Sequence, residues 1–385
     1  MRPEITEQVG RILRGPHDMS ARVEVWRGGV RQDTFGDAGL PFRSGSVTND
    51  ATAKVRRQVS LELPNSDALF NLLTVPGTEL RPFRQVRSVG GAATYADVPL
   101  GRMEVDSPRI GYHPQRGTIT VTGGDYFAKV QASEFLLPGV AEFGTVISTQ
   151  AVTFLQQALP GVSIINQLTS PYVIGAKVWD TDRAAAITEL TDALGAELLF
   201  DATGRAVLRL VPQVSGTAVW TVDADNPTAV LMDASREHTL QRTRNVVVCT
   251  STAVDGEPLF DPVIVWDSDP ASPTYAGTDP LLNPQSAGPF GIRPDRLSSP
   301  LITTAEQAQQ AATLRLGKVS GAGRKLSLTA AVNPGLEPGD TIAVQLPRGL
   351  DGRRPVEAHI VDSVTIPLVP DEPQQIGTRA FGPAA

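Results

Sequence analysis

The clearest pattern of apolar and polar positions lies within residues 180–211. Three residues that favour helix N-caps open the segment, and apolar side chains then recur at i, i+3 and i+7, which predicts a helix with one apolar face. The cap-forming residues are Asp180, Thr181 and Asp182, and the apolar positions are Ile187, Leu190 and Leu194. Gly195 follows as a residue that accepts the positive φ common after a helix C-terminus.

Two short strands are predicted after this helix. Residues 197–200 and 207–210 are mainly apolar, and Asp201-Ala202-Thr203-Gly204 between them is typical of a tight turn. Pro212 ends the second strand. The segment therefore predicts an αββ module that packs its own small core, and nothing in it is typical of catalysis.

Residues 21–130 alternate like strands and are interrupted by Pro and Gly. In residues 54–64 the alternation places Val55, Arg57, Val59, Leu61 and Leu63 on one face, and Arg56, Gln58, Ser60 and Glu62 on the other. Gly28-Gly29 predicts a hairpin turn after a strand that contains Val23 and Val25. Further strands are predicted at 80–86, 100–105 and 118–122. Many short strands at near-regular spacing favour a closed or sandwich-like β domain.

Residues 131–250 have a mixed pattern. A helix is predicted over 145–159, with Val146, Val152, Leu155 and Leu159 on its buried side and Gly161 after it. Strands are predicted at 218–222, 229–232 and 245–250, and the last follows Arg236, Arg242 and Arg244. Cys249 alternates like a strand residue and is predicted to be a small buried side chain.

Residues 251–300 are rich in Pro, Gly, Asp and Ser and predict a long loop, which we expect to be an extended arm that packs on a neighbour. Thr303-Thr304-Ala305-Glu306 is a capping-box pattern that opens a helix ending at Gly317. Strands are predicted at 325–331, 341–346 and 358–366, with a tight turn at 336–340. A short helix is predicted over 4–13, and the tail 371–385 is predicted to be polar and loose.

Composition narrows the function classes. The 385 residues carry a net charge of −7, which argues against a surface that coats nucleic acid. A single cysteine excludes an intrachain disulfide. No window approaches about 18 consecutive apolar residues, so no membrane-spanning helix is predicted. The N-terminus lacks the apolar region of a signal peptide.

Motifs that carry chemistry are missing from the sequence. The four histidines, His17, His113, His238 and His359, do not stand near Cys, His or acidic pairs at metal-ligand spacing. No GxSxG or GxxxxGK[ST] motif occurs, and the runs at 123–125 and 321–323 are predicted to be turns. The acidic residues at 261–279 lack the order of an EF-hand loop. The arginine clusters 81–87 and 353–354 lack interleaved aromatic residues for base stacking. We therefore predict no catalytic, cofactor-binding or metal-binding residue, and no cofactor.

Several segments in a fixed order carry a family resemblance. They are WDTDRAAAITELTDALGAELLFDATGRAVLRLVP (179–212), VWTVDADNPTAVLMDASREHTLQRTRNVVVC (219–249), WDSDPASPTYAG (266–277), SSPLITTAEQAQQAATLRL (298–316), NPGLEPGDTIAVQLP (333–347) and IVDSVTIPL (360–368). Together they resemble the minor tail proteins of actinobacterial phages and prophages, which are related to baseplate-hub or tail-hub proteins. LGRMEVDSPRI and TITVTGGDYFAKV (100–110 and 118–130) fit the first hub domain.

The resemblance implies a mostly β fold with α/β parts: two tube-like antiparallel β-barrel domains and a peripheral αββ module. The expected division is an N-terminal arm (1–20), a first barrel (21–130), an α/β middle domain (131–212), a second barrel (213–250 and 301–370) with a long inserted loop (251–300), and a C-terminal tail (371–385).

The resemblance also implies a non-enzymatic structural component of the virion, synthesised in the host cytoplasm. The expected protein is a homotrimeric tail hub at the tail tip, which closes the tail tube, adapts its six-fold ring to three-fold symmetry and lets DNA pass through its lumen. Expected partners are other copies of itself, the distal tail protein or tail-tube ring, the tape measure protein, and tail-tip or fibre proteins. The alternatives are the hub of a contractile injection system and a cell-wall carbohydrate-binding or hydrolytic β protein.

Overall fold

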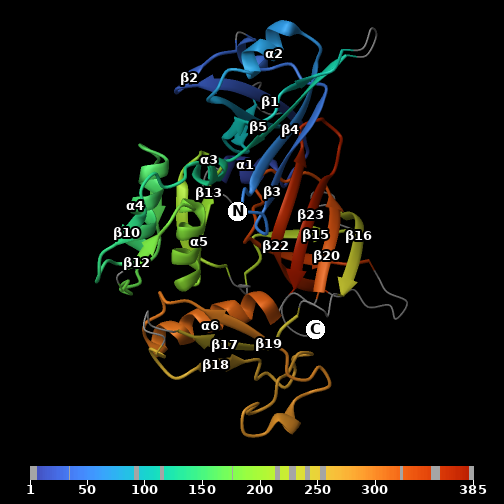
Figure 1. Cartoon of the computed structure of the whole chain (residues 1–385). Coiled ribbons are helices and arrows are strands. Elements are labelled where there is room, and N and C mark those ends of the chain that lie inside the picture. Colours follow the sequence, from blue (N-terminus) through green and yellow to red (C-terminus); the bar gives the residue numbers. More distant parts are fainter. Residues whose placement is uncertain are drawn as a thin grey trace.

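The computed structural model describes residues 7–33, 35–90, 95–112, 117–175, 177–212, 217–224, 231–238, 243–251, 257–320, 324–347 and 356–380. Over these ranges the chain is mostly β, with large antiparallel sheets and several α/β parts. Two β arms occupy the upper and right-hand parts of Figure 1, while helices α4, α5 and α6 lie at the left and below.

The first arm is built from strands between residues 17 and 124. They are β1 (His17–Arg27), β2 (Val30–Arg31), β3 (Ser44–Asp50), β4 (Arg57–Pro64), β5 (Thr78–Ser88), β6 (Ala96–Pro99), β7 (Met103–Val105), β8 (Arg109–Ile110) and β9 (Thr118–Gly124). Short helices α1 (Glu7–Ile12), η1 (Gly36–Ala38) and α2 (Asp67–Leu73) accompany them. The predicted alternation in β4 is confirmed, because Arg57, Val59, Leu61 and Leu63 are all buried. The hairpin at Gly28-Gly29 is also confirmed, since both glycines have positive φ between β1 and β2.

The second arm is built from strands near the C-terminus and two from the middle of the chain. They are β15 (Trp220–Asp223), β16 (Leu231–His238), β20 (Arg324–Ala330), β21 (Thr341–Gln345), β22 (Val356–Pro367) and β23 (Gln374–Ala380). The longest, β22, pairs with β21 through its first half and with β3 of the first arm through its second half. That pairing joins the two arms into one sheet of 15 strands.

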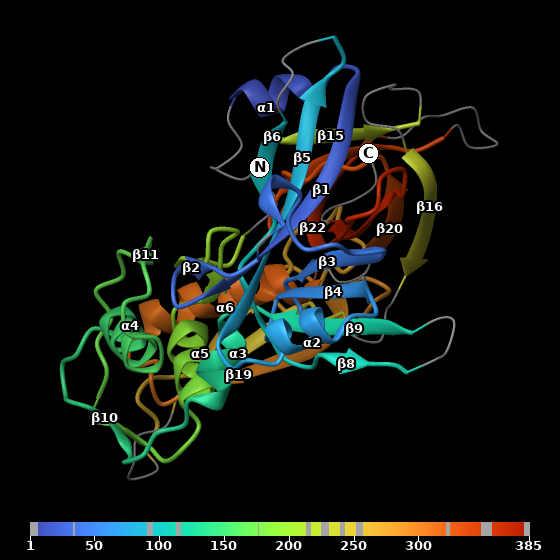
Figure 2. The same cartoon turned by 90° about the horizontal axis from the view of Figure 1, so that it is seen from above.

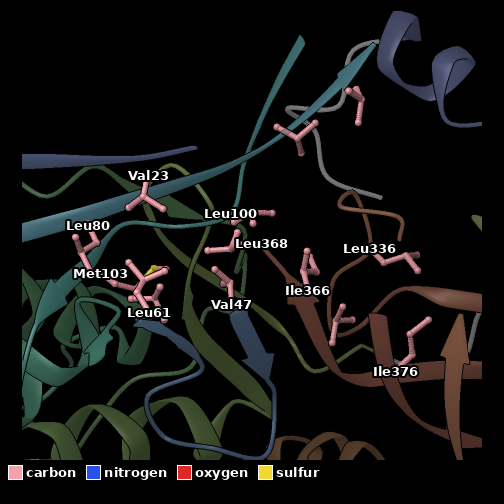
Figure 3. Close-up of a cluster of buried hydrophobic side chains, with 14 of the residues drawn as sticks. Val23, Val47, Leu61, Leu80, Leu100, Met103, Leu336, Ile366, Leu368 and Ile376 are labelled. Carbon is pink, nitrogen blue, oxygen red and sulfur yellow. The ribbon is translucent and has the colours of Figure 1, made fainter. Parts of the chain in front are cut away.

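The arms also share one hydrophobic core. Side chains from both arms gather in it, among them Val23, Val47, Leu61, Leu80, Leu336, Ile366 and Ile376 (Figure 3). The main pairing path of the described strands runs from β16 at one edge to β2 at the other, and β21, β15, β6 and β8 branch from it.

A second core holds the α/β parts. Its elements in the middle of the chain are α3 (Phe127–Ala132), β10 (Gly139–Ala141), α4 (Ile147–Ala158), β11 (Ile164–Asn166), β12 (Lys177–Trp179), α5 (Arg183–Ala193), β13 (Ala196–Phe200) and β14 (Ala206–Leu210). The predicted αββ module is confirmed as α5, β13 and β14. Asp182 is the N-cap of α5 and accepts a hydrogen bond from the Ala185 amide at 2.8 Å, and Gly195 follows with a φ of 62°.

The loop predicted over 251–300 is wrong in part. This segment contains β18 (Val263–Trp266), η2 (Pro284–Ser286) and β19 (Pro294–Ser298), and both strands pair with β17 (Val246–Thr250). Helix α6 (Ala305–Ser320) contacts β17 and β18, so β17, β18, β19 and α6 form an α/β unit. This unit shares the second core, to which Val247, Cys249 and Ala308 contribute. The strand 245–250 therefore does not join the second arm as expected.

Smaller predictions also need correction. In α4 only Leu155 of the four expected residues is fully buried, because the buried side is turned toward Ile147, Ala151 and Phe154. Gly123 and Gly124 end strand β9 and do not form a turn. Residues 100–102 precede β7 and are not in a strand, and β16 extends well beyond 232. The prediction of a loose tail over 371–385 is wrong in part, because β23 occupies 374–380. Residues 4–6, Arg242, the run 321–323, the pair 353–354 and the tail end 381–385 lie outside the described residues, as do 229–230 of a predicted strand.

Candidate interaction surfaces

Two of the four histidines make hydrogen bonds within the fold. The imidazole Nδ1 of His17 bonds the Gly15 carbonyl at 2.7 Å, and buried His359 lies between the Glu357 carboxylate (3.2 Å) and the Thr378 hydroxyl (3.0 Å). His113 lies outside the described residues. Within the described ranges, no group of three or more His, Cys, Asp or Glu side chains could hold a metal ion. None of the described helices is long and apolar enough to cross a membrane.

Most acidic residues of 261–279 accept hydrogen bonds within the turns in which they lie. The Asp267 carboxylate accepts hydrogen bonds from the Ser272 and Thr274 hydroxyls at 2.5 and 2.6 Å. Asp279 accepts from the amides of Leu281 and Leu282, both at 3.0 Å. These contacts account for the cluster without a bound ion.

One face of the large sheet carries an unusual set of side chains. In register across seven strands from β16 to β9, the side chains that point away from the core are mainly hydroxyls and amides. We call this the hydroxyl face; its members are Ser46, Thr48, Gln58, Ser60, Thr120, Thr122, Ser235, Ser327, Thr329, Ser363, Thr365 and Gln375. Figure 2 shows β3, β4 and β9 side by side at one end of it.

Cross-strand pairing makes the hydroxyl face continuous over both arms. One row runs Thr329, Gln375, Thr365, Thr48 and Gln58 across five neighbouring strands. The Thr48 and Thr365 hydroxyls are 3.0 Å apart where the two arms meet. Charged side chains on this side of the sheet stand toward strand ends or on the edge strand; they are Asp50, Glu62, Asp233, Glu237, Lys325 and Arg379, which pairs with Asp362.

The hydroxyl face is hollowed at its β4–β9 end. A groove of about 920 Å³ has Ser60 and Thr122 on its floor, and α3 and the end of β7 form its walls. Gly123 lies against β7 so closely that a Cβ there would stand 2.5 Å from the Glu104 carbonyl oxygen. The groove is lined mainly by small and polar groups.

Charged contacts fix the α/β parts around the second core, which we call the α/β body, against the arms. The buried Arg57 guanidinium donates to the carbonyls of Phe200 (2.9 Å) and Leu100 (3.1 Å) and to the Glu337 carboxylate. Glu197 of β13 accepts from Arg56 at 2.8 Å and from Arg209 at 2.9 Å. Burial works to raise the pKa of Glu197, but the two guanidinium groups outweigh it and hold the pKa below its ordinary value.

Tyr126, at the start of α3, makes a further contact between the α/β body and the first arm. Its hydroxyl donates to the Glu79 carboxylate of β5 at 2.9 Å. Burial and this neighbouring carboxylate together raise the pKa of Tyr126 to about 12. The phenol is therefore held as a neutral hydrogen-bond donor between the α/β body and the first arm.

An exposed apolar surface lies on the α/β body, in the segment that follows α3 and on β12. It consists of Leu136, Leu137, Val140, Phe143 and Val178, which we call the apolar knuckle. Leu136 is 99% exposed and Phe143 is 83% exposed. Val140 and Val178 lie on strands β10 and β12, at the periphery of the molecule (Figure 1), and the other three residues lie just before and just after β10.

The similarity of this chain to known proteins lies in its fold. Neither a protein-family model nor a curated protein sequence matches the chain. Among solved structures it is similar to a tail protein from Neisseria meningitidis MC58, with a TM-score of 0.62, 12% identity, and 94% of this chain and 96% of that one covered. The chain has the fold of phage tail proteins.

Two further structures agree with this tail-protein fold. The 43 kDa tail protein of prophage MuSo2 from Shewanella oneidensis matches with a TM-score of 0.59 and 13% identity, covering 93% of this chain and 98% of that one. The prophage tail protein gp18 from Listeria monocytogenes EGD-e matches with a TM-score of 0.55 and 10% identity, each chain being covered to 94%. At these identities the likeness shows a shared tail-protein fold and no individual residue role.

No site residue was predicted from the sequence, and neither the hydroxyl face nor the apolar knuckle was anticipated. Part of the signal for the hydroxyl face was visible, because Gln58 and Ser60 alternate with buried residues. The extent of the face could not be predicted, because it depends on pairing between β3 and β22, which lie more than 300 residues apart. Four of the five knuckle residues lie in the run FLLPGVAEF (135–143), whose apolar residues are ordinary for a core.

Proposed function

We propose that this protein is a non-enzymatic structural component of a phage tail, a homotrimeric hub at the tail tip of actinobacterial phages or prophages. The hub closes the tail tube and adapts its six-fold ring to three-fold symmetry. Its partners are the distal tail protein or tube ring, the tape measure protein, and tail-tip or fibre proteins. The tail-protein fold over 94% of the chain supports this assignment.

The observation that carries the proposal is the hydroxyl face. A DNA conduit must neither bind phosphate nor repel it strongly. Lysine and arginine side chains bind phosphate and release counterions, so a basic lumen would retain DNA. The hydroxyl face offers mainly uncharged groups over seven strands of both arms, with charged side chains of both signs toward strand ends and on the edge strand. In the proposed trimer, this face lines the channel through which DNA passes.

Arginine substitutions test the conduit role. Ser60 and Thr122 are exposed cross-strand partners on the hydroxyl face, so Ser60→Arg and Thr122→Arg add charge without burying it. We expect virions with either variant to assemble normally and eject DNA at least about tenfold more slowly, because arginine binds passing phosphates. Thr313→Arg on the exposed side of α6 is the matched control. Unchanged ejection with both face variants would contradict the role.

A second candidate is the hub of a contractile injection system. Chains of the Francisella PdpA–VgrG complex match with TM-scores of 0.51–0.53 and 9% identity, and this chain covers 54–67% of their length. The cargo of the purified particle distinguishes the two candidates. A phage tail would deliver DNA, and an injection system would deliver protein. Sheath and ATPase genes beside the coding sequence would favour the second.

A carbohydrate-binding role has less support. Sugar-binding sites commonly use aromatic side chains as apolar platforms, and the groove on the hydroxyl face has no aromatic residue in its lining. A glycan-binding assay with purified cell walls distinguishes this alternative from the hub.

A further inference from the structure

We propose that the apolar knuckle on β10 and β12 is a docking site for a basic, apolar polypeptide segment of a different protein. The inference rests on exposure, rigid support and charge around the knuckle, and it does not depend on the trimer proposed above.

The knuckle exposes large apolar side chains to solvent. Leu136, Leu137 and Phe143 are 80–99% exposed, and the cross-strand pair Val140 and Val178 is more than half exposed. Leu136, Leu137 and Val140 line one groove, and Val178 is the cross-strand partner of Val140. Isolated exposed apolar residues are ordinary, but neighbouring ones such as these mark interaction surfaces. An aromatic residue beside several leucines is also the composition of an interface hot spot.

The backbone beneath the knuckle is firmly held. The ring of buried Phe135 packs edge-on against Phe154, with centroids 4.8 Å apart, and Phe154 packs in the same way on Trp179. The Arg183 guanidinium lies 4.6 Å from the Phe135 ring centroid and donates to the Ser133 carbonyl at 3.0 Å. A surface held in one conformation binds with little loss of conformational entropy.

A groove of about 540 Å³ adjoins the knuckle. Leu137, Val140 and Thr145 line it on one side, and Gln150 and Gln157 of α4 line it on the other. The groove gives an incoming side chain a recess between the β10 strand and α4. The knuckle is therefore a shaped site with exposed apolar side chains at its margin.

The charge around the knuckle is acidic. Glu134, Glu142, Asp180 and Asp182 are all exposed in the segments that form or flank it. Of the cations in these same segments, Lys177 pairs with Glu189, and Arg183, which also lines the groove, is 9% exposed and lies over the Phe135 ring. Electrostatic complementarity thus selects a partner that combines apolar side chains with lysine or arginine. The same acidic rim disfavours an anionic lipid surface.

Selection from a library of displayed random 16-residue peptides tests this docking site. The whole wild-type protein is the target, and the double variant Leu137→Ser/Phe143→Ser is used for counter-selection. We expect enriched peptides to carry a net positive charge and at least two large apolar residues. Synthetic versions should bind the wild type at least tenfold more tightly than the variant by fluorescence polarisation, and should weaken as salt is raised.

Charge reversal and a matched control complete the test. Glu134→Lys/Glu142→Lys should weaken the same peptides about tenfold, whereas Leu282→Ser, which removes a leucine that is 87% exposed elsewhere, should leave binding unchanged. Equal thermal midpoints would show that the variants fold. The proposal is overturned if no peptide is enriched, if enriched peptides are neutral or acidic, or if they bind the double variant equally. It is also overturned if sedimentation shows the wild type self-associating through these residues, because the occupant would then be a second copy.

Discussion

At the scale of single residues, buried charge joins the parts of this molecule. Arg57 is 1% exposed and bonds groups from three regions: Leu100 of the first arm, Phe200 of the α/β body and Glu337 beside the second arm. The alternation of residues 54–64 predicted that Arg57 shares a face with valines and leucines. Its partners could not be predicted, because they lie up to 280 residues away.

Removing Arg57 should therefore destabilise more than its own strand. We expect Arg57→Ala to lower the free energy of unfolding by about 3 kcal/mol, since it leaves buried carbonyls and a carboxylate without their donor. The control is Arg205→Ala, which removes a more exposed pair with Asp201 and should cost less than about 1 kcal/mol. Urea denaturation measures both, and equal losses would contradict the role of Arg57.

Glu197 predicts a dependence of stability on pH. Its pKa in the folded protein lies below the ordinary value of 4.5, because Arg56 and Arg209 outweigh the effect of burial. The carboxylate therefore contributes stability that is fully present above pH 4.5 and is lost as pH falls through the folded pKa. We expect Glu197→Gln to cost about 2 kcal/mol at pH 7 and clearly less at pH 3.

The control for Glu197 is a carboxylate on the surface. Exposed Glu306→Gln should change stability little at either pH. A loss from Glu197→Gln that stays constant between pH 7 and pH 3 would show that the carboxylate is not held ionised by its partners.

At the scale of elements, local signals decided what could be predicted. Helix α5 was predicted correctly because its N-cap, apolar face and C-terminal glycine all lie within 16 residues of sequence. Strands β18 and β19 were missed because the segment around them is rich in turn-forming residues, and β19 begins at Pro294. Its pairing with β17 is parallel and spans more than 40 residues, which no local pattern reveals.

A substitution at Gly195 tests how closely the C-terminal end of α5 packs on α6. The φ of Gly195 is 62°, and a Cβ there would lie 2.3 Å from a methyl carbon of Leu314 in α6. We expect Gly195→Ala to cost about 1–2 kcal/mol from the left-handed backbone alone, and more from the overlap. Gly161→Ala isolates the backbone contribution, since Gly161 also has positive φ and meets no atom within 4 Å. Equal urea midpoints for the two variants would contradict the close contact with α6.

At the scale of the whole molecule, β22 decides the architecture. Because β22 pairs with β21 and then with β3, the two arms share one sheet and one core, and their polar sides form one surface. The sequence predicted two strand-rich arms around an α/β middle, and the mostly β fold with α/β parts is confirmed. The pairing that joins the two arms could not be predicted from the sequence, because β3 and β22 are separated by almost the whole chain.

The central claim is that three copies of this chain surround a DNA channel lined by the hydroxyl face. An electron-microscopy map of the intact tail tests it most directly. We expect a ring of three copies at the end of the tail tube, with Thr48, Ser60 and Thr365 facing the lumen, and a trimer mass for the purified protein. A protein that is strictly monomeric and absent from tail tips, or a ring whose hydroxyl face points outward, would contradict the account.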